Sequence, residues 1–228
     1  MRRPRFIAEQ ARHARGLLGR LIASIMARET WAQNQRAVDA LALRSRDHVI
    51  DIGCGHGRSL AALAGGAPHG RVVGVDPSDL MAEIAVSRNR ALVKAGRVDV
   101  RVASAADLPY GGNSFDKALC VHVIYFWKDL ATSFREIARV LKPGARFVLV
   151  FRTDADKAAV DAFPSDVYCF RPLSEVAAAL NHAGFTIDPD HLAEQEAATP
   201  VLLIATKRQS VGAPSQATLT AKDPQDAG

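Results

Sequence analysis

Residues 48–58 read HVIDIGCGHGR, and this stretch decides the fold. The apolar run Val49–Ile52 predicts a buried strand, with an acidic residue, Asp51, near its end. Three glycines then occupy every second position: Gly53, Gly55 and Gly57. Because glycine has no Cβ to clash, such a run lets the backbone turn sharply and pass close to a ligand. A helix starting near Arg58 would point its free N–H groups at the same place, which predicts a cradle for a nucleotide-like ligand.

A second acidic residue follows the next predicted strand. That strand is expected at Arg71–Val75, and Asp76 stands directly after it. In nucleotide-binding α/β folds, an acidic residue at this position accepts hydrogen bonds from the ribose hydroxyls. Pro77 and Ser78 come next, so the alternative is that Asp76 only caps the following helix.

Predicted strands and helices alternate along the rest of the chain. Further strands are expected at Val98–Val102, Asp116–Val121, Arg146–Phe151, Phe185–Ile187 and Val201–Lys207. Helices are expected at Trp31–Leu43, Ser59–Ala64, 79–94, Leu130–Leu141 and Ser174–His182, with a turn at 142–144. The alternation predicts an α/β fold, in which helices cover both faces of a mostly parallel sheet.

The glycine spacing differs from the dinucleotide-binding pattern G-x-G-x-x-G. Asp51 and the three glycines form D-x-G-x-G-x-G, which resembles motif I of the class I S-adenosylmethionine (SAM)-dependent methyltransferases. Later stretches resemble further motifs of that family in the same order: Ser104–Tyr110 (SAADLPY), Asn113–Asp116 (NSFD) and Leu141–Gly144 (LKPG). The resemblance covers about Ala37 to Lys207 and is to the small-molecule and lipid type, similar to the ubiquinone and menaquinone enzymes. On its own, the glycine run has a less favoured alternative, a tight turn that binds nothing.

The resemblance implies a Rossmann-like, seven-stranded sheet with an antiparallel last strand and with SAM over the carboxyl ends of the first four strands. Asp51 would orient the methionine amino group, directly or through water, and Asp76 would bind the ribose. Ser104 stands where the family often has an acidic residue for the adenine amine, so its uncharged hydroxyl should bind more weakly. The residues expected at the cofactor are Asp51, Gly53, Cys54, Gly55, Gly57, Asp76, Pro77, Ser78, Met81, Ser104, Ala105, Ala106 and Val121.

The acceptor side is expected at Val121–Trp127 (VHVIYFW), directly after a predicted strand. His122 is the best candidate for a general base because it is titratable and stands beside the cleft, although a packing role is the equal alternative. Tyr125, Phe126 and Trp127 would form an aromatic wall around an apolar or cationic acceptor, unless two of them are core residues. The candidate catalytic residues are therefore His122 and Tyr125.

Positive charge is concentrated at the N-terminus. Residues 1–28 hold seven arginines and one glutamate, a charge of +6 against +5 for the whole chain, which leaves −1 for the remainder. This distribution disfavours specific nucleic acid binding by the domain itself. Apolar residues at helical spacing predict an amphipathic helix: Leu17, Leu18, Leu21, Ile22, Ile25 and Met26. Three roles stay open for it: a lid over the cofactor, a contact with an anionic membrane surface, or a cleaved targeting peptide.

These patterns divide the chain into an N-terminal helical lid segment (1–45), a SAM-binding methyltransferase domain (46–207) and a disordered tail (208–228). Three cysteines far apart in sequence form no metal-type pair and indicate a reducing, cytoplasmic compartment, with peripheral membrane contact if residues 1–28 bind lipid. The expected function is methyl transfer from SAM to a small-molecule or lipid acceptor. The alternatives are a non-catalytic SAM-binding regulator and an aminopropyl transferase that uses decarboxylated SAM.

Overall fold

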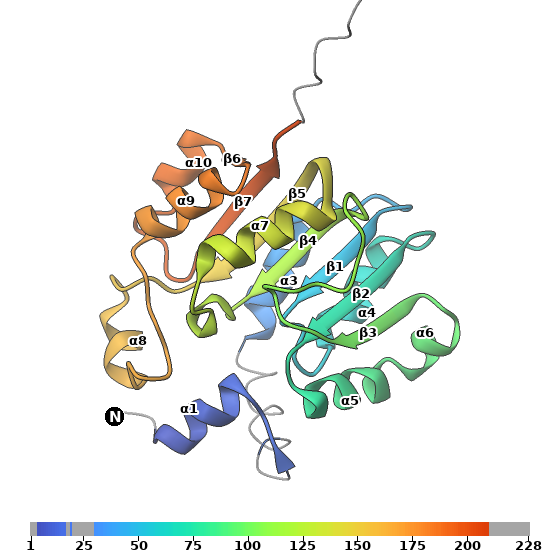
Figure 1. The fold of residues 1–228 in the computed structure, drawn as a ribbon, viewed down its shortest axis with the longest axis horizontal. Coiled ribbons are helices and arrows are strands. Elements are labelled where there is room, and N and C mark those ends of the chain that lie inside the picture. The colour runs from blue at the N-terminus through green and yellow to red at the C-terminus, as the bar shows by residue number, and fades with distance from the viewer. Residues whose placement is uncertain (1–3, 17–18, 20–29, 210–228) are drawn as a thin grey trace, which may run out of the picture.

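A seven-stranded sheet forms the centre of the computed structural model, which describes residues 4–16, 19 and 30–209 (Figure 1). The strands are β1 (His48–Ile52), β2 (Arg71–Asp76), β3 (Val98–Val102), β4 (Phe115–Val121), β5 (Leu141–Phe151), β6 (Phe185–Ile187) and β7 (Val201–Lys207). Their order is β3-β2-β1-β4-β5-β7-β6. The first five strands are parallel, and β7 lies antiparallel between β5 and β6. The expected Rossmann-like sheet with an inserted antiparallel strand is confirmed.

Helices cover both faces of this sheet. They are α1 (Arg5–Arg12), α3 (Trp31–Ala40), α4 (Arg58–Gly66), α5 (Asp79–Arg88), α6 (Arg90–Lys94), the 3₁₀ helix η1 (Ile124–Phe126), α7 (Leu130–Val140), α8 (Lys157–Ala162), α9 (Leu173–His182) and α10 (Pro189–Glu194). Successive strand residues point to opposite faces. Ile50 and Ile52 therefore share a core cluster with Phe134 of α7, whereas Val49 shares one with Leu60 of α4. Figure 1 shows α7 in front of the sheet and α4 behind it.

Two expectations about secondary structure were wrong. The helix expected at 79–94 is divided into α5 and α6 at Asn89, whose buried side chain donates to the carbonyl oxygens of Gly57 (2.8 Å) and Ala85 (2.9 Å). The turn expected at 142–144 lies inside β5 as an irregularity, because the register with β4 shifts between Phe115 and Lys117. The short helices η1, α8 and α10 were not expected. The other strands agree with the sequence prediction to within one residue at each end.

The N-terminal amphipathic helix is tested only in part. Helix α1 lies within its expected range, but the apolar positions from Leu17 to Met26 that define its face lie outside the described residues. The expected tail at 208–228 lies outside them too, except for residues 208 and 209. Within the described parts of the chain, no helix combines the length and the apolar character needed to cross a bilayer.

Candidate functional site

The glycine turn after β1 is hydrogen-bonded to the end of β2. The N–H groups of Gly53 and Cys54 both donate to the carbonyl oxygen of Val75, at 2.8 and 3.0 Å. Gly53 has a φ of +73°, and a Cβ added there would lie 2.4 Å from Cγ1 of Val123. Both the left-handed backbone and the lack of space require glycine at this position. The backbone of the turn at Gly53 therefore packs directly against the side chain of Val123, in the loop after β4.

Asp76 faces this turn, and two backbone donors hold its carboxylate. Gly55 N–H donates to Oδ2 at 3.0 Å, and Ser78 N–H donates to Oδ1 at 2.9 Å. The side chain is only 8% exposed, and burial raises its pKa while the two N–H bonds oppose that shift. At Gly55, by contrast, an added Cβ would meet nothing within 4 Å, so the turn opens here onto free space. The carboxylate of Asp76 and the open backbone of Gly55 therefore border one cavity.

That cavity has a volume of about 850 Å³ and lies at the carboxyl ends of the parallel strands, where open α/β sheets bind ligands. Most of the residues expected at the cofactor line it: Gly53, Cys54, Gly55, Asp76, Pro77, Ser78, Met81, Ser104, Ala105 and Val121. Asp51, Gly57 and Ala106 do not. The N–H of Ala106 instead donates to Ser104 Oγ at 3.2 Å. The sequence thus identified most of one wall of the cavity.

Asp51 lies behind the wall rather than in it. It is 3% exposed and accepts a 2.5 Å hydrogen bond from Ser59 Oγ, and Ser59 itself lines the cavity. Burial raises the pKa of Asp51 to about 7, with a smaller contribution from the charge of Asp76. Ser59 was not recognised from the sequence, although its place as the second residue of the helix after the glycines is a usable signal.

Residues 9–15 close one side of the same cavity. Ser78 Oγ donates to the carbonyl oxygen of Ala14 at 3.0 Å, and the buried side chain of Ala14 shares a small apolar cluster with Met81. His13 lies near enough to Asp76 to affect its pKa. The N-terminal segment and a predicted cofactor-binding wall are therefore joined directly.

His122, the candidate base, lies at the end of β4 with a φ of +59° and with both ring nitrogens hydrogen-bonded. Its Nδ1 lies 2.9 Å from Oη of Tyr125, and its Nε2 contacts Oε1 of Gln33 on α3. Tyr125 Oη also accepts from the N–H of Arg152 at 2.7 Å. Burial and the charge of Arg152 lower the pKa of His122 to about 4. In this arrangement neither ring nitrogen is free to take a proton.

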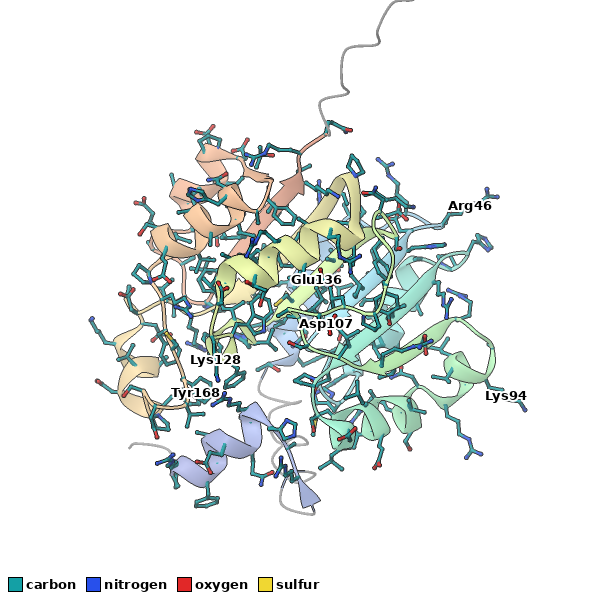
Figure 2. All side chains as sticks on the ribbon, viewed as in Figure 1. Arg46, Lys94, Asp107, Lys128, Glu136 and Tyr168 are labelled. Atoms are coloured by element: carbon teal, nitrogen blue, oxygen red, sulfur yellow. The ribbon has the colours of Figure 1, made fainter. Side chains whose placement is uncertain are left out.

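A second cavity, of about 290 Å³, lies on the other side of His122; we call it the aromatic cavity. Its lining is Thr30, Gln33, His122, Tyr125, Arg152, Ala158, Ala159, Ala162, Phe163, Tyr168 and Phe170. Figure 2 shows Tyr168 on the segment after α8, at the end of the sheet where α1 lies. Of the predicted aromatic wall, Tyr125 lines this cavity, whereas Phe126 and Trp127 line the larger one.

The sequence prediction did not include the remaining aromatic and polar residues of this lining. The aromatic density of residues 163–170 (FPSDVYCF) was the available signal.

Comparison with known proteins agrees with this geometry. Residues 50–149 match the family model described as a methyltransferase domain. This part of the chain is therefore similar to a methyltransferase domain. The similarity is concentrated in the part of the chain that contains the glycine turn, Asp76 and His122, so this domain contains the central part of the site.

Curated relatives are similar to this methyltransferase domain over part of their length. An O-methyltransferase, cnsE, of Penicillium expansum is 39% identical over 103 residues, which are 45% of this chain and 37% of that protein. A demethylmenaquinone methyltransferase of Symbiobacterium thermophilum is 36% identical over 106 residues, 46% and 42% of the two chains. The chain thus spans less than half the length of these relatives.

Solved structures share the fold of the methyltransferase domain. A putative methyltransferase in complex with the Trm112 activator from Haloferax volcanii has a TM-score of 0.69 at 21% identity, over 92% of this chain and 100% of that one. Geranyl diphosphate C-methyltransferase from Streptomyces coelicolor A3(2), in complex with S-adenosyl-L-homocysteine (SAH), has a TM-score of 0.63 at 21% identity, over 80% and 81%. At these identities the likeness concerns the fold alone.

Proposed function

We propose that this protein is a SAM-dependent methyltransferase that acts on a small-molecule acceptor. The observation that carries the proposal is Asp76, a buried carboxylate held by the N–H groups of Gly55 and Ser78 beside a glycine turn that opens onto a cavity of about 850 Å³. Each carboxylate oxygen has a further lone pair for a ribose hydroxyl. Relatives over the same residues are named as O-methyltransferases and quinone methyltransferases.

The charge of the site fits a cationic cofactor. Asp51 and Asp76 are both buried, and burial raises both pKa values, so a nearby positive group would favour their ionised forms. SAM carries a sulfonium and an ammonium group. Asp76 would bind the ribose hydroxyls. Ser59, whose hydroxyl donates to Asp51, would link Asp51 to the ammonium group of SAM. Met81 would pack against the adenine.

In this function the protein mainly orients SAM and the acceptor and removes water from around them. Bound SAM supplies an already activated methyl group, so large covalent assistance by a side chain is not needed. The glycine turn and Asp76 would fix the position of the cofactor, while the loop after β4 would place the acceptor in line with it. Residues 9–15, which line the cavity and bond to Ser78, would act as a lid that excludes water, within an N-terminal segment (1–45) that precedes the catalytic domain (46–207).

The test is calorimetric titration with SAM and SAH. The unchanged protein should bind both at micromolar affinity, and Asp76→Ala should weaken both by at least about tenfold, or ~1.4 kcal/mol. Asp79→Ala is the matched control, because Asp79 is exposed three positions later and does not line the cavity. Unchanged affinity in Asp76→Ala would refute the ribose assignment. No binding of either compound to the unchanged protein would refute the proposed function.

A second candidate is a SAM-binding regulator without turnover. The observation that favours it is that both ring nitrogens of His122 are already bonded, to Tyr125 and Gln33. An assay for SAH production with a panel of phenols, quinols and amines distinguishes the two functions. Turnover of any of them would exclude the purely regulatory function. A lack of turnover with intact SAM binding would favour it.

A lipid acceptor, a membrane contact and a cytoplasmic location are supported by the sequence alone. The support is the basic and apolar composition of residues 1–28 and the lack of paired cysteines in the sequence. Sedimentation with vesicles containing anionic lipid, compared with neutral vesicles, tests the membrane contact. If the protein stays in the supernatant with both, membrane binding through residues 1–28 is refuted.

A further inference from the structure

The hydrogen bonds around His122 determine which ring nitrogen carries the proton. Gln33 Oε1 can only accept, and it contacts Nε2, so Nε2 carries the hydrogen. Tyr125 Oη accepts from the N–H of Arg152, which leaves its own hydrogen to donate to Nδ1. A neutral imidazole has one N–H, and these partners place it on Nε2. His122 is therefore a hydrogen-bond donor at the boundary between the two cavities.

The aromatic cavity has the shape and lining for a flat ring. Tyr168 and Phe170 lie nearly parallel, with ring centroids 5.9 Å apart and an interplanar angle of 17°, and Tyr125 lies 5.0 Å from Phe170. The alanines of α8, including Ala162, leave space along another side. The volume of about 290 Å³ is close to the lower end of the about 300–1,000 Å³ usual for small-molecule sites, which suits one or two fused rings.

The polar groups of this cavity are few, and two of them, Thr30 and His122, also line the larger cavity. Its hydrogen-bonding atoms come from Thr30, Gln33, His122, Tyr125 and Arg152. A ring seated among the aromatic side chains would thus present a substituent at His122 toward the cofactor side. The hydrogen on Nε2 requires that this substituent be an acceptor of hydrogen bonds.

We propose that the aromatic cavity binds the methyl acceptor as a planar conjugated oxyanion, a phenolate or enolate, and that His122 Nε2–H donates to its oxygen in place of Gln33. This proposal rests on the proposed function and names its substrate class. His122 is then a binding donor rather than the general base that the sequence suggested. Tyr125 is a positioning residue, since it acts through the ring of His122.

The reaction needs no proton transfer to the protein under this proposal. The acceptor loses its proton to solvent before transfer. A lone pair of its oxygen then forms the new C–O bond, while the electrons of the breaking C–S bond stay on sulfur. An anion and a sulfonium cation become a neutral ether and a neutral thioether, so charge and atoms balance.

The surroundings of His122 agree with a neutral donor. Among the residues that the structure describes, the titratable and charged groups that face it are Tyr125 and Arg152, and Arg152 is paired with Asp156 at 2.5 Å. Burial and Arg152 lower the pKa of His122 to about 4, so the ring stays uncharged at neutral pH. A base with that pKa would take a phenol proton poorly, whereas an N–H donor beside a positive guanidinium suits an oxyanion.

The test uses 4-nitrophenol as the probe, added to the full chain saturated with SAH, because its ionised form has its own absorbance band. Bound probe should ionise at lower pH than free probe, with its pKa decreased by about one unit, which corresponds to about tenfold tighter binding of the phenolate than of the phenol. Ala162→Leu should abolish probe binding by filling the cavity and leave SAH affinity unchanged. Ala155→Leu, at an exposed position outside the cavity, should change neither.

Two substitutions at position 122 separate donor from base. His122→Gln keeps an N–H donor near the place of Nε2 but cannot act as a base, and His122→Leu has neither property. Both substituted residues have the same backbone strain at a φ of +59°, so this strain does not affect the comparison between them. We expect His122→Gln to keep the decrease in probe pKa and His122→Leu to lose it, with roughly tenfold weaker phenolate binding.

Three results would overturn the proposal. They are probe that binds as the neutral phenol, probe that does not bind the SAH complex, and equal losses in His122→Gln and His122→Leu. Each of these can occur with SAH affinity intact, and then only the acceptor proposal fails. If the unchanged protein does not bind SAH, the proposed function fails and the acceptor proposal with it.

Discussion

Ser78 Oγ donates a 3.0 Å hydrogen bond to the carbonyl oxygen of Ala14, a residue 64 positions earlier in the sequence. The same Ser78 hydroxyl accepts from the N–H of Met81 at 3.4 Å, so it caps α5 while it binds the N-terminal segment. Its own N–H donates to Asp76. One residue therefore connects the proposed ribose carboxylate, the helix that follows it and the segment that closes the cavity.

Deleting residues 1–15 should accelerate the release of SAH. The deletion removes the wall formed by residues 9–15 and exposes the cavity to solvent, so we expect about tenfold faster dissociation, or ~1.4 kcal/mol. Competition kinetics with excess unlabelled SAH measure this rate. Arg5→Ala is the control: its ion pair with Asp166 is exposed to solvent and screened, so the rate should hardly change. An unchanged rate in the deletion would exclude a lid function.

Alanine at Gly55 and alanine at Gly53 should have different consequences. Gly55→Ala strains a φ of +53° by roughly 1–2 kcal/mol, but its Cβ meets no protein atom within 4 Å and enters the cavity. We expect a folded protein whose SAH affinity is at least about tenfold lower. Gly53→Ala places a Cβ 2.4 Å from Val123 Cγ1, which adds an overpacking cost of about 1–3 kcal/mol.

Thermal unfolding and calorimetry together check this pair of substitutions. Gly53→Ala should have the lower melting temperature, and Gly55→Ala should have the larger binding defect relative to its loss of stability. Normal SAH affinity in Gly55→Ala would mean that the ligand does not approach this edge of the turn.

Asn89→Ala should destabilise the fold from a position outside the cavity wall. Its side-chain amide donates to the carbonyl oxygens of Gly57 and Ala85. The backbone N–H of residue 89 still donates to Ala85 in the variant, so the cost of about 1–3 kcal/mol comes from leaving the buried carbonyl oxygen of Gly57 unpaired. Denaturant unfolding measures the loss. Asn181→Ala, at an exposed position on α9, is the control and should stay within about 0.5 kcal/mol. Equal stability of the two variants would show that the bonds of Asn89 do not stabilise the glycine turn.

The fold could be predicted from the sequence because its signals are local. Apolar runs such as Val49–Ile52 mark buried strands, and the glycine spacing after Asp51 marks the turn between strand and helix. Asp76 was predicted for the same reason, since it ends β2, the strand that pairs with β1. The break at Asn89 was missed because it depends on a bond to Gly57, 32 positions away.

The acceptor side could not be predicted to the same depth. Gln33 and His122 are 89 positions apart, and nothing local in either stretch indicates that their side chains meet. The same holds for residues 163–170, which reach the site only because the chain after β5 folds back over His122. The sequence indicated that His122 is titratable, but the two partners of its ring, which decide whether it donates or accepts, lie on two other elements, α3 and η1. The domain bounds at 45 and 207 and the individual cofactor contacts stay predictions.

The contribution of Asp51 to the stability of the cofactor-free protein should fall as the pH rises toward neutrality. It opposes the contributions of His56 and His122, whose pKa values burial lowers to about 4. Burial raises its pKa from 3.8 to about 7 in the fold. Between these values Asp51 holds a proton in the folded protein that it has lost in the unfolded chain, so its contribution to the free energy of unfolding decreases with rising pH and levels off above about pH 7. The contribution is roughly 4 kcal/mol at most. Asp51→Asn, which carries no charge, should lack this contribution, so its stability relative to the unchanged protein should increase from pH 5 to pH 8 and it should be the more stable of the two at pH 8.

Urea unfolding at pH 5, 6, 7 and 8 measures the effect. Asp79→Asn, a substitution of an exposed acidic residue on α5, should keep the slope of the unchanged protein. The proposed cofactor adds a second check. If the ammonium group of SAM lies near Asp51 and Ser59, saturating SAM should stabilise the ionised form and reduce the loss of stability near pH 7, whereas 5′-methylthioadenosine, which lacks the amino acid portion, should not. A slope that is the same in Asp51→Asn and in the unchanged protein would show that Asp51 does not titrate in this range.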